Sequence, residues 1–298
     1  MGFEAPRRLV RALGEDGGRE GLRDWLDRLP AIAEETVARL GLDAERVVAP
    51  GGRGSLIVLV RLGDGTPAAL KLIPPGGAAA QERAALAHWD GRFAVRLLDA
   101  PEAPAAGDAL LLERLHPEVS LRSLPEAKAL LEAAATVRRL WVPPPAGHPF
   151  ETVADRTARQ VLALRALDDP LATAALDARA RLTEDAPEAL LLHGSFRQGK
   201  VLAADRVPWL TVGPRPVVGE RAYDLARLVR DRAEDLVAAS SGPSAARRRV
   251  NRLADSLEID PARLRGWALF RAVESGTRAL AAGRVREAES SLEFASWL

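Results

Sequence analysis

The sequence predicts an α+β fold in two lobes, with a small antiparallel sheet first and a mostly helical lobe after it. Strand-like alternation with Gly-rich turns runs through residues 46–114, and helical periodicity dominates from Leu124 onward. A short strand-rich stretch at 191–216 interrupts the helices. With 298 residues, 47% of them apolar, the chain can bury a full core. We expect an N-lobe at 1–115 and a C-lobe at 116–298.

Composition and charge argue against several classes of protein. A net charge of +1 gives no electrostatic footprint for nucleic acid. The sequence has no run of about 18 uncharged apolar residues that would span a membrane. The N-terminus lacks an export signal, and the absence of Cys excludes disulfides and Cys-ligated metal. We therefore expect a cytoplasmic protein without nucleic-acid or membrane partners, and the sequence does not indicate an oligomeric state.

The first lobe is predicted to begin with a loosely held arm over 1–18. Apolar residues at helical spacing predict a helix at 20–29 that Pro30 ends, and a second helix at 31–40 that Gly41 ends. The remaining elements expected in this lobe are a helix at 78–90 and strands at 47–48, 55–62, 67–73, 94–98 and 109–114.

Lys71 and Glu82 are charged residues that are predicted to point inward. The two-residue period of a strand puts Lys71 on one face with Ala69 and Ile73. The period of the following helix puts Glu82 on one stripe with Leu86. An inward Lys is costly unless it is paired. Either both side chains snorkel past apolar neighbours, or they form an ion pair.

The second lobe is predicted to be helical around its strand-rich centre. Its helices are expected at 124–140, 151–168, 170–184, 221–238, 244–256, 261–282 and 284–296, and its strands at 190–193, 200–204 and 208–212. Trp267, Phe270 and Glu274 share one face of a helix. This pattern indicates core packing or, alternatively, a ligand pocket lined by aromatic rings and a carboxylate.

Five stretches of the chain occur in an order that is specific to one family. They are DGTPAALKL (64–72), LAHWDGRFAVRLLDA (86–100), ALLLERL (109–115), the segment 191–232 that begins LLHGSFRQGK, and LRGWALFRAVES (264–275). They resemble the aminoglycoside phosphotransferase superfamily, and within it the streptomycin 6-kinase and hydroxyurea phosphotransferase group. The resemblance implies a bilobal protein-kinase-like fold and ATP-dependent transfer of phosphate to a small molecule.

The resemblance also implies roles for individual residues. Lys71 and Glu82 match the pair that positions nucleotide phosphates, and the backbone from Glu113 to Leu115 matches the hinge that meets adenine. His193 and Asp224 match structural positions of the catalytic loop, where the Asp braces the loop from below. A residual nucleotide site that can bind ATP is therefore expected.

Three positions depart from the family's chemistry. The resemblance implies a catalytic Asp, a metal-binding Asn and a metal-binding Asp where this chain has Ser195, Lys200 and Gly213. A Ser offers no carboxylate as general base, and a Lys offers only donors where Mg²⁺ needs oxygen ligands. We therefore expect no catalytic residue, no Mg²⁺ site and no required cofactor. Asp205, in a predicted turn, is a weak candidate for a compensating carboxylate.

Ser195 and Lys200 are instead candidates for ligand binding. Lys200 is suited to holding a phosphate without Mg²⁺, or it is an exposed loop Lys that pairs with a nearby carboxylate. His193-Gly194-Ser195 superficially suggests a serine hydrolase, but the G-x-S-x-G pattern and its strand-to-helix elbow are missing.

Three functions remain open from the sequence. The first is a catalytically inactive homologue that binds a small-molecule natural product or antibiotic and gives self-resistance by sequestering the drug. The second is an active antibiotic O-phosphotransferase with a rearranged site, and the third is a nucleotide-binding regulator. The first is favoured because the three replacements affect the chemistry and spare the scaffold.

Overall fold

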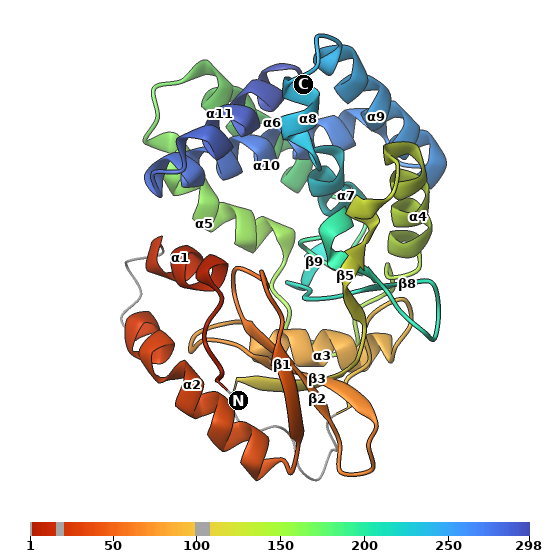
Figure 1. The fold of residues 1–298 in the computed structure, drawn as a ribbon. Helices are drawn as coiled ribbons and strands as arrows, with labels where there is room; N and C mark the ends of the chain where they lie inside the picture. The colour runs from red at the N-terminus through yellow and green to blue at the C-terminus, as the bar shows by residue number, and fades with distance from the viewer. Residues whose placement is uncertain (1, 16–20, 99–107) are drawn as a thin grey trace. The chain divides into compact units, whose positions relative to one another are not determined.

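The computed structural model describes residues 2–15, 21–98 and 108–298, and the chain forms two compact units (Figure 1). The first unit is Met1–Val119 with Leu202–Val212, and the second is Ser120–Val201 with Gly213–Leu298. Strands dominate the centre of the first unit, and helices make up most of the second. The α+β prediction is confirmed, and the lobe boundary at residue 115 stays a prediction.

An antiparallel sheet forms the centre of the first unit. Its strands, in spatial order, are β1 (Asp43–Val47), β2 (Leu56–Arg61), β3 (Pro67–Leu72) and β4 (Ala109–Glu113). Val58 and Val60 of β2 and Leu70 of β3 lie on one face and join the apolar core with side chains from the N-terminal helices. Lys71 lies on the other face of β3, opposite Ile57 in the register.

The helices described in the first unit are α1 (Arg7–Glu15), α2 (Leu22–Arg39) and α3 (Ala79–Trp89). The arm predicted over 1–18 is wrong for the residues of α1, because Leu9 and Leu13 are buried in the core of this unit. The rest of that arm, from residue 16, lies outside the described residues. The helix predicted at 78–90 is confirmed as α3.

Pro30 lies inside α2, so the predicted break between helices 20–29 and 31–40 is wrong. The buried residues of α2 form one stripe that continues across the proline: Leu22, Trp25, Leu29, Ala33 and Thr36. A proline in a helix interior costs about 3 kcal/mol. Each large apolar side chain that is buried contributes about 1.5–3 kcal/mol. Burial on both sides of Pro30 therefore outweighs the lost hydrogen bond.

A second sheet has the strand order β5-β7-β8. Its strands are β5 (His116–Ser120), β7 (Val201–Ala203) and β8 (Trp209–Thr211). β5 was not predicted, because its sequence HPEVS shows no apolar alternation. The strand predicted at 94–98 is wrong. In the segment 94–98, the Val95 N–H donates to Thr211 O and the Leu98 N–H donates to Leu111 O. The segment therefore forms no continuous ladder with either neighbour.

The long helix α10 (Pro261–Ala281) is the centre of the second unit and packs against α6, α7 and α11. The other helices are α4 (Glu126–Arg138), α5 (Val153–Arg165), α6 (Pro170–Glu184), α7 (Arg221–Val229), α8 (Ala233–Val237), α9 (Gly242–Leu257) and α11 (Val285–Ser296), with 3-10 turns η1 (Leu121–Ser123) and η2 (Gln198–Lys200). The single helix predicted at 221–238 is wrong, because Arg232 adopts a left-handed φ of 57° between α7 and α8.

A two-stranded sheet leads into the loop that the sequence analysis singled out. β6 (Leu190–Leu192) pairs antiparallel with β9 (Val217–Gly219), with Leu191 opposite Val218. β9 was not predicted. The loop 193–200 follows β6 directly, and residues 213–216 lead into β9, so this pairing holds both segments at the same end of the sheet.

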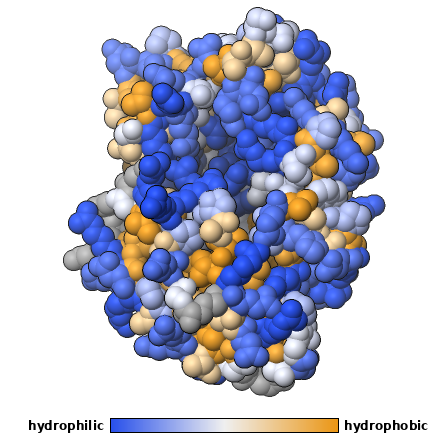
Figure 2. All heavy atoms as spheres, in the orientation of Figure 1, coloured by the Kyte–Doolittle hydropathy of each residue, from blue (hydrophilic) through white to orange (hydrophobic). Residues whose placement is uncertain are grey.

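Hydrophilic side chains cover most of the face shown in Figure 2, and hydrophobic ones are scattered between them. The large hydrophobic side chains that are exposed, such as Leu131, Leu162 and Val285, come from separate helices. Among the described residues, no helix is long and apolar enough to cross a membrane.

Candidate functional site

In the first unit, Lys71 of β3 and Glu82 of α3 form a buried ion pair. The Lys71 Nζ atom lies 2.7 Å from Glu82 Oε1 and 2.5 Å from Oε2. The two residues are only 8% and 4% exposed. The predicted pairing is confirmed, and the alternative of snorkelling side chains is wrong. A pair with two short contacts offsets part of the cost of removing both charges from water.

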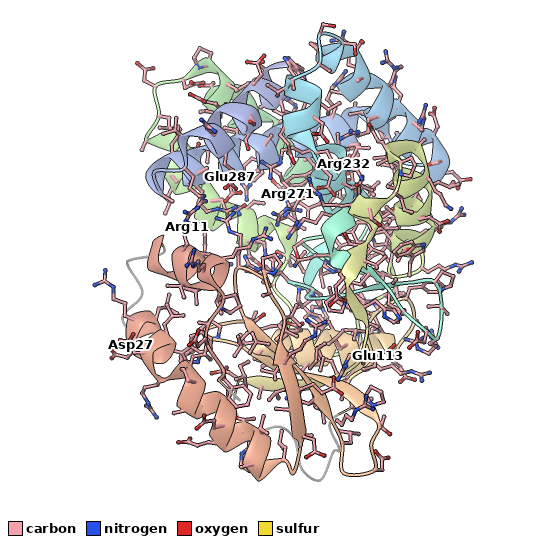
Figure 3. All side chains as sticks on the ribbon, viewed as in Figure 1. Arg11, Asp27, Glu113, Arg232, Arg271 and Glu287 are labelled. Carbon is pink, nitrogen blue, oxygen red and sulfur yellow. The ribbon has the colours of Figure 1, made fainter. Side chains whose placement is uncertain are left out.

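Glu113 ends β4, and its polar groups are engaged within the first unit (Figure 3). Its backbone N–H donates to Arg96 O at 3.0 Å. Its carboxylate accepts from Arg96 N–H at 2.9 Å and from Arg206 Nη2 at 3.0 Å. Leu115 is 6% exposed. The role of Glu113 and Leu115 as a nucleotide hinge stays a prediction.

In the second unit, Asp224 of α7 holds the start of the loop 193–200. Its carboxylate accepts hydrogen bonds from His193 N–H at 2.9 Å and Gly194 N–H at 2.8 Å, and from Trp141 Nε1 at 3.3 Å. The side chain is completely buried. Burial raises the pKa of the Asp224 carboxyl, and these hydrogen bonds oppose that shift. The expected position of Asp224 beneath the loop is therefore present in the structure.

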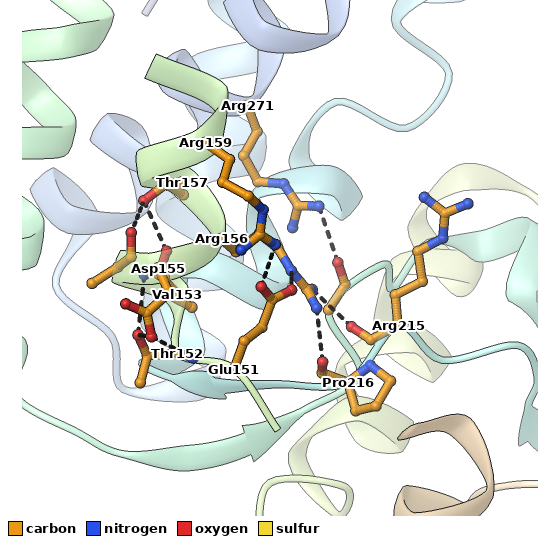
Figure 4. Close-up of polar contacts among 12 residues, drawn as sticks. Glu151, Thr152, Val153, Asp155, Arg156, Thr157, Arg159, Arg215, Pro216 and Arg271 are labelled. Atoms are coloured by element: carbon orange, nitrogen blue, oxygen red, sulfur yellow. Dashed lines mark hydrogen bonds and ion pairs between the residues drawn. The ribbon is translucent and has the colours of Figure 1, made fainter. Parts of the chain in front are cut away.

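Gly194 can only be a glycine in this backbone. Its φ is +72°, and an added Cβ atom would lie 1.9 Å from Arg215 O. Two arginines bind carbonyl groups around it (Figure 4). Arg156 donates to Arg215 O and Pro216 O, each at 2.8 Å, and Arg271 donates to Gly194 O at 3.0 Å. The loop 193–200 and the segment 213–216 are thus tied together from both sides.

Ser195, Lys200 and Gly213, the three replaced positions, contact one another. Lys200 Nζ donates to Ser195 Oγ at 2.5 Å and also to Gly213 O. Ser195 Oγ lies 3.5 Å from the same carbonyl oxygen. Ser195 is 1% exposed and Lys200 is half-buried, so the alternative of Lys200 as an exposed loop residue is wrong. These contacts unite positions 195, 200 and 213 in one cluster, which we call the Lys200 triangle.

The donors of the Lys200 triangle do not fit Mg²⁺. The cation needs several hard oxygen ligands, and the triangle offers one hydroxyl, one carbonyl and an ammonium group that already binds both. Within residues 2–15, 21–98 and 108–298, no three His, Cys, Asp or Glu side chains lie together as metal ligands. Asp205, the weak candidate for a compensating carboxylate, belongs to the first unit and contacts His116 Nε2 at 2.8 Å.

Trp267 and Phe270 are packed in the core of the second unit. They are 1% and 0% exposed, and the Trp267 ring meets Tyr223 edge-on at 5.1 Å between centroids. Trp267 Nε1 donates to Glu220 at 2.6 Å. Glu274 is paired with Arg278 at 3.0 Å. The two rings show the core packing that the helical pattern indicated, and a ligand-binding role for Trp267, Phe270 and Glu274 stays a prediction.

One protein-family model matches the part of the chain that contains both the Lys71–Glu82 pair and the loop held by Asp224. The model of the aminoglycoside/hydroxyurea antibiotic resistance kinases matches residues 41–283. The chain belongs to this family. The expected membership of this group is therefore confirmed.

Relatives in this kinase family match nearly the whole chain. Streptomycin 6-kinase of Streptomyces griseus is 33% identical over 303 residues, which cover 97% of each protein. Hydroxyurea phosphotransferase of Kitasatospora aureofaciens is 35% identical over 287 residues, which cover 91% of this chain and 79% of that protein. The family resemblance therefore extends through both units.

Solved structures of related kinases share the fold. Aminoglycoside phosphotransferase APH(4)-Ia matches with a TM-score of 0.60 at 16% identity, over 89% of this chain and 96% of that one. Choline kinase LicA from Streptococcus pneumoniae matches with a TM-score of 0.58 at 11% identity, over 90% and 99%. The predicted bilobal kinase-like fold is confirmed by these matches.

Sequence reasoning missed the arginines that surround the loop in this member of the family. Arg156 and Arg271 lie on helices 115 residues apart in the chain, and no local pattern connects them. Arg227, at the end of α7, was also not singled out. No local pattern marked it, because Asp224 and Asp231 lie at helical spacing from it and suggest an ordinary pairing.

Proposed function

We propose that the chain binds a small natural product or antibiotic without phosphorylating it, and that it protects its host by sequestering the compound. The Lys200 triangle is the observation that supports this proposal. It puts a hydrogen-bonded Lys in the loop where the family's metal-binding Asn is expected, and a Ser where the catalytic Asp is expected.

The replacement of the general base has a large cost for catalysis. A positioned general base typically contributes about 10²- to 10⁴-fold to the rate. The Ser195 hydroxyl accepts from Lys200 and has no carboxylate charge with which to take up a proton. A Lys ammonium at this position also repels Mg²⁺, so the proposed function needs no metal.

Binding is the property that the rest of the molecule supports. The loop is held by Asp224, and the ion pair of Lys71 with Glu82 is formed. Relatives with solved structures bind drugs: one was crystallised with ADP and hygromycin B, and another, from Streptomyces rimosus, with ADP and streptomycin. We propose that ATP can bind at Lys71 but that no cofactor is required for the binding of the small molecule.

A second candidate function is phosphate transfer to an antibiotic by a rearranged site. The Lys71–Glu82 pair favours it, because this pair positions nucleotide phosphates in active kinases. This candidate requires turnover of ATP that depends on a divalent metal and on the hydroxyl of a substrate.

Two measurements on the full-length chain separate these functions. Transfer of labelled phosphate from ATP is measured with streptomycin, hygromycin B and hydroxyurea at several Mg²⁺ concentrations, with Lys71→Ala as the control. Binding of the same compounds is measured by calorimetry. We expect binding of a small molecule at one site without transfer of phosphate. Metal-dependent transfer that is lost in Lys71→Ala would overturn the proposal, and so would nucleotide binding without binding of any small molecule.

A matched variant tests the metal argument directly. Lys200→Asn restores the family's residue at one position and removes the ammonium from the triangle. We expect the wild-type chain not to bind Mn²⁺ in an electron paramagnetic resonance titration without ATP, which would itself chelate the ion, and the variant to bind it measurably more tightly. Equal Mn²⁺ affinity in the two proteins would show that Lys200 does not exclude the metal.

A further inference from the structure

Five arginines gather at one place in the second unit. Arg227 and Arg230 lie one turn apart at the end of α7, on the face that also bears Tyr223. Arg271 and Arg278 lie on one face of α10, and α7 packs against α10. Arg197, just before η2, acts electrostatically on Arg227 and completes the group. We call these residues the arginine cluster: Arg197, Arg227, Arg230, Arg271 and Arg278.

Most members of the arginine cluster have identified partners. Arg271 stacks on Tyr223, with its guanidinium carbon 4.3 Å from the ring centroid, and donates to Gly194 O at 3.0 Å. Arg230 donates to Ser291 Oγ of α11 at 2.8 Å, and Arg278 pairs with Glu274. Through its hydrogen bond to Gly194, Arg271 puts the cluster next to the loop that contains Ser195.

Arg227 differs from the others. It makes no hydrogen bond and no ion pair with the residues that the structure describes, although its side chain is partly buried. Burial lowers the pKa of Arg227 well below its usual value, and Arg271 and Arg230 lower it further. Arg227 is therefore a partly buried guanidinium group to which the described residues supply no hydrogen-bonded counter-charge.

The nearby carboxylates do not balance this positive charge. Burial and Arg271 lower the pKa of Arg230 to about 10, and Glu274 and Glu287 act in the opposite direction. Asp224 and Glu234 also lie near the cluster, but Asp224 accepts from the His193 and Gly194 N–H groups and Glu234 pairs with Arg122. Glu274 is already paired with Arg278, and Glu287 with Arg284 at 2.9 Å. Gathering like charges among partly buried groups is unfavourable unless an anion balances them.

We propose that the arginine cluster binds an oxyanion, a phosphate or carboxylate group carried by the small molecule that this chain recognises, with Arg227 as the principal contact. The planar guanidinium group donates two parallel hydrogen bonds to such a group. This inference rests on the proposed binding function and names the charge class of its ligand. A polycationic aminoglycoside is disfavoured at this site, because it would meet the arginines with like charge.

The test uses inorganic phosphate and citrate as oxyanion probes, with streptomycin as a cationic comparison and hydroxyurea as an uncharged one. Binding to the full chain is measured by calorimetry and thermal unfolding at pH 7 and two ionic strengths. Arg227→Gln removes the principal contact. Arg252→Gln, an exposed position on α9, removes the same charge elsewhere in the second unit. We expect phosphate or citrate to bind, and Arg227→Gln to weaken that binding at least tenfold while Arg252→Gln changes it less than twofold.

Thermal unfolding distinguishes a ligand-binding Arg227 from a structural one. Because Arg227 makes no described contact within the chain, Arg227→Gln should not lower the melting temperature without anion, and it should abolish the increase that the anion produces in the wild-type chain. Failure of both oxyanions to bind would overturn the inference, and so would equal weakening by the two variants. Streptomycin binding that Arg227→Gln leaves unchanged would also overturn it and would leave the proposed binding function standing. Transfer of phosphate would overturn the proposed function alone, because the oxyanion measurements need no turnover.

Discussion

Two lysines, one in each unit, show how differently the two halves of the molecule treat a partly or fully buried cation. Lys71 binds a carboxylate, so its charge is balanced by Glu82 and the pair is almost completely buried. Lys200 is half-buried and binds a hydroxyl and a backbone carbonyl. In the first unit the Lys forms the ion pair that kinases use to position nucleotide phosphates. In the second unit the Lys fills a region where the resemblance leads us to expect a metal ion. The two lysines therefore differ in whether a carboxylate balances their charge.

The scaffold of the second unit depends most strongly on Asp224. Asp224→Ala leaves the N–H groups of His193 and Gly194 and the Trp141 indole without an acceptor inside the protein. Each unsatisfied buried donor costs about 1–3 kcal/mol, so we expect the three together to lower the free energy of unfolding by about 3–9 kcal/mol. Chemical denaturation measures this loss. Asp205→Ala is the control, because its side chain is 87% exposed, and it should change stability by less than about 0.5 kcal/mol. Similar effects of the two variants would show that the loop is not held by Asp224.

The ion pair of the first unit is expected to give the next largest effect. Lys71→Met leaves Glu82 buried without a counter-charge, which typically costs about 3–5 kcal/mol. The double variant Lys71→Met with Glu82→Leu removes both charges and should recover most of that loss. Denaturation of the wild type and of the single and double variants gives the coupling between the two residues. If the double variant were as unstable as Lys71→Met, the loss of stability would come from altered packing rather than from the unbalanced charge of Glu82.

The periodicity of the sequence was enough to predict features that depend on a single helix or strand. The inward directions of Lys71 and Glu82 follow from the strand and helix periods. Their pairing lowers the free-energy cost of burying both charges. The long helices of the second unit were predicted within a few residues for the same reason. The helix α1 was missed because the stretch 1–18 has weak periodicity and several glycines, and the break at Pro30 was wrong because tertiary burial outweighs a local rule.

The contacts of the site depend on tertiary structure and could not be predicted in detail. Gly213 lies 13 residues from Lys200, and the pairings of β7 with β8 and of β6 with β9 bring its carbonyl to the ammonium group. The Arg227 side chain lies on a helix whose pattern fits an ordinary amphipathic face. Its lack of a hydrogen-bond or ion-pair partner among the described residues becomes visible only when α10 and α11 are in place. The resemblance predicted which residues are replaced, but not that the replacements bind one another.

The smallest expected effect concerns the support of the altered loop by Glu151. Its carboxylate binds Arg156 at 2.6 Å and also Arg159, and Arg156 in turn holds the carbonyls of Arg215 and Pro216 (Figure 4). Burial raises the pKa of Glu151, but the hydrogen bonds from these arginines outweigh it and leave the pKa below its usual value. Folding therefore favours the ionised form. This contribution to stability is complete above the unfolded-state pKa of 4.5 and is lost as the pH falls through the lower pKa of the folded state.

Glu151→Gln should therefore be less stable than the wild type at pH 7 and almost equal to it near pH 3. The pair is partly exposed to solvent, which limits the difference at pH 7 to less than about 1 kcal/mol. Denaturation at a series of pH values measures it. Glu289→Gln, on the exposed side of α11, should show no difference from the wild type at either pH. A deficit of Glu151→Gln that persists unchanged at low pH would mean that Glu151 supports the loop through its shape rather than its charge. Because Lys71 and Glu82 lie in the other unit, the effect of Lys71→Met should be additive with that of Glu151→Gln.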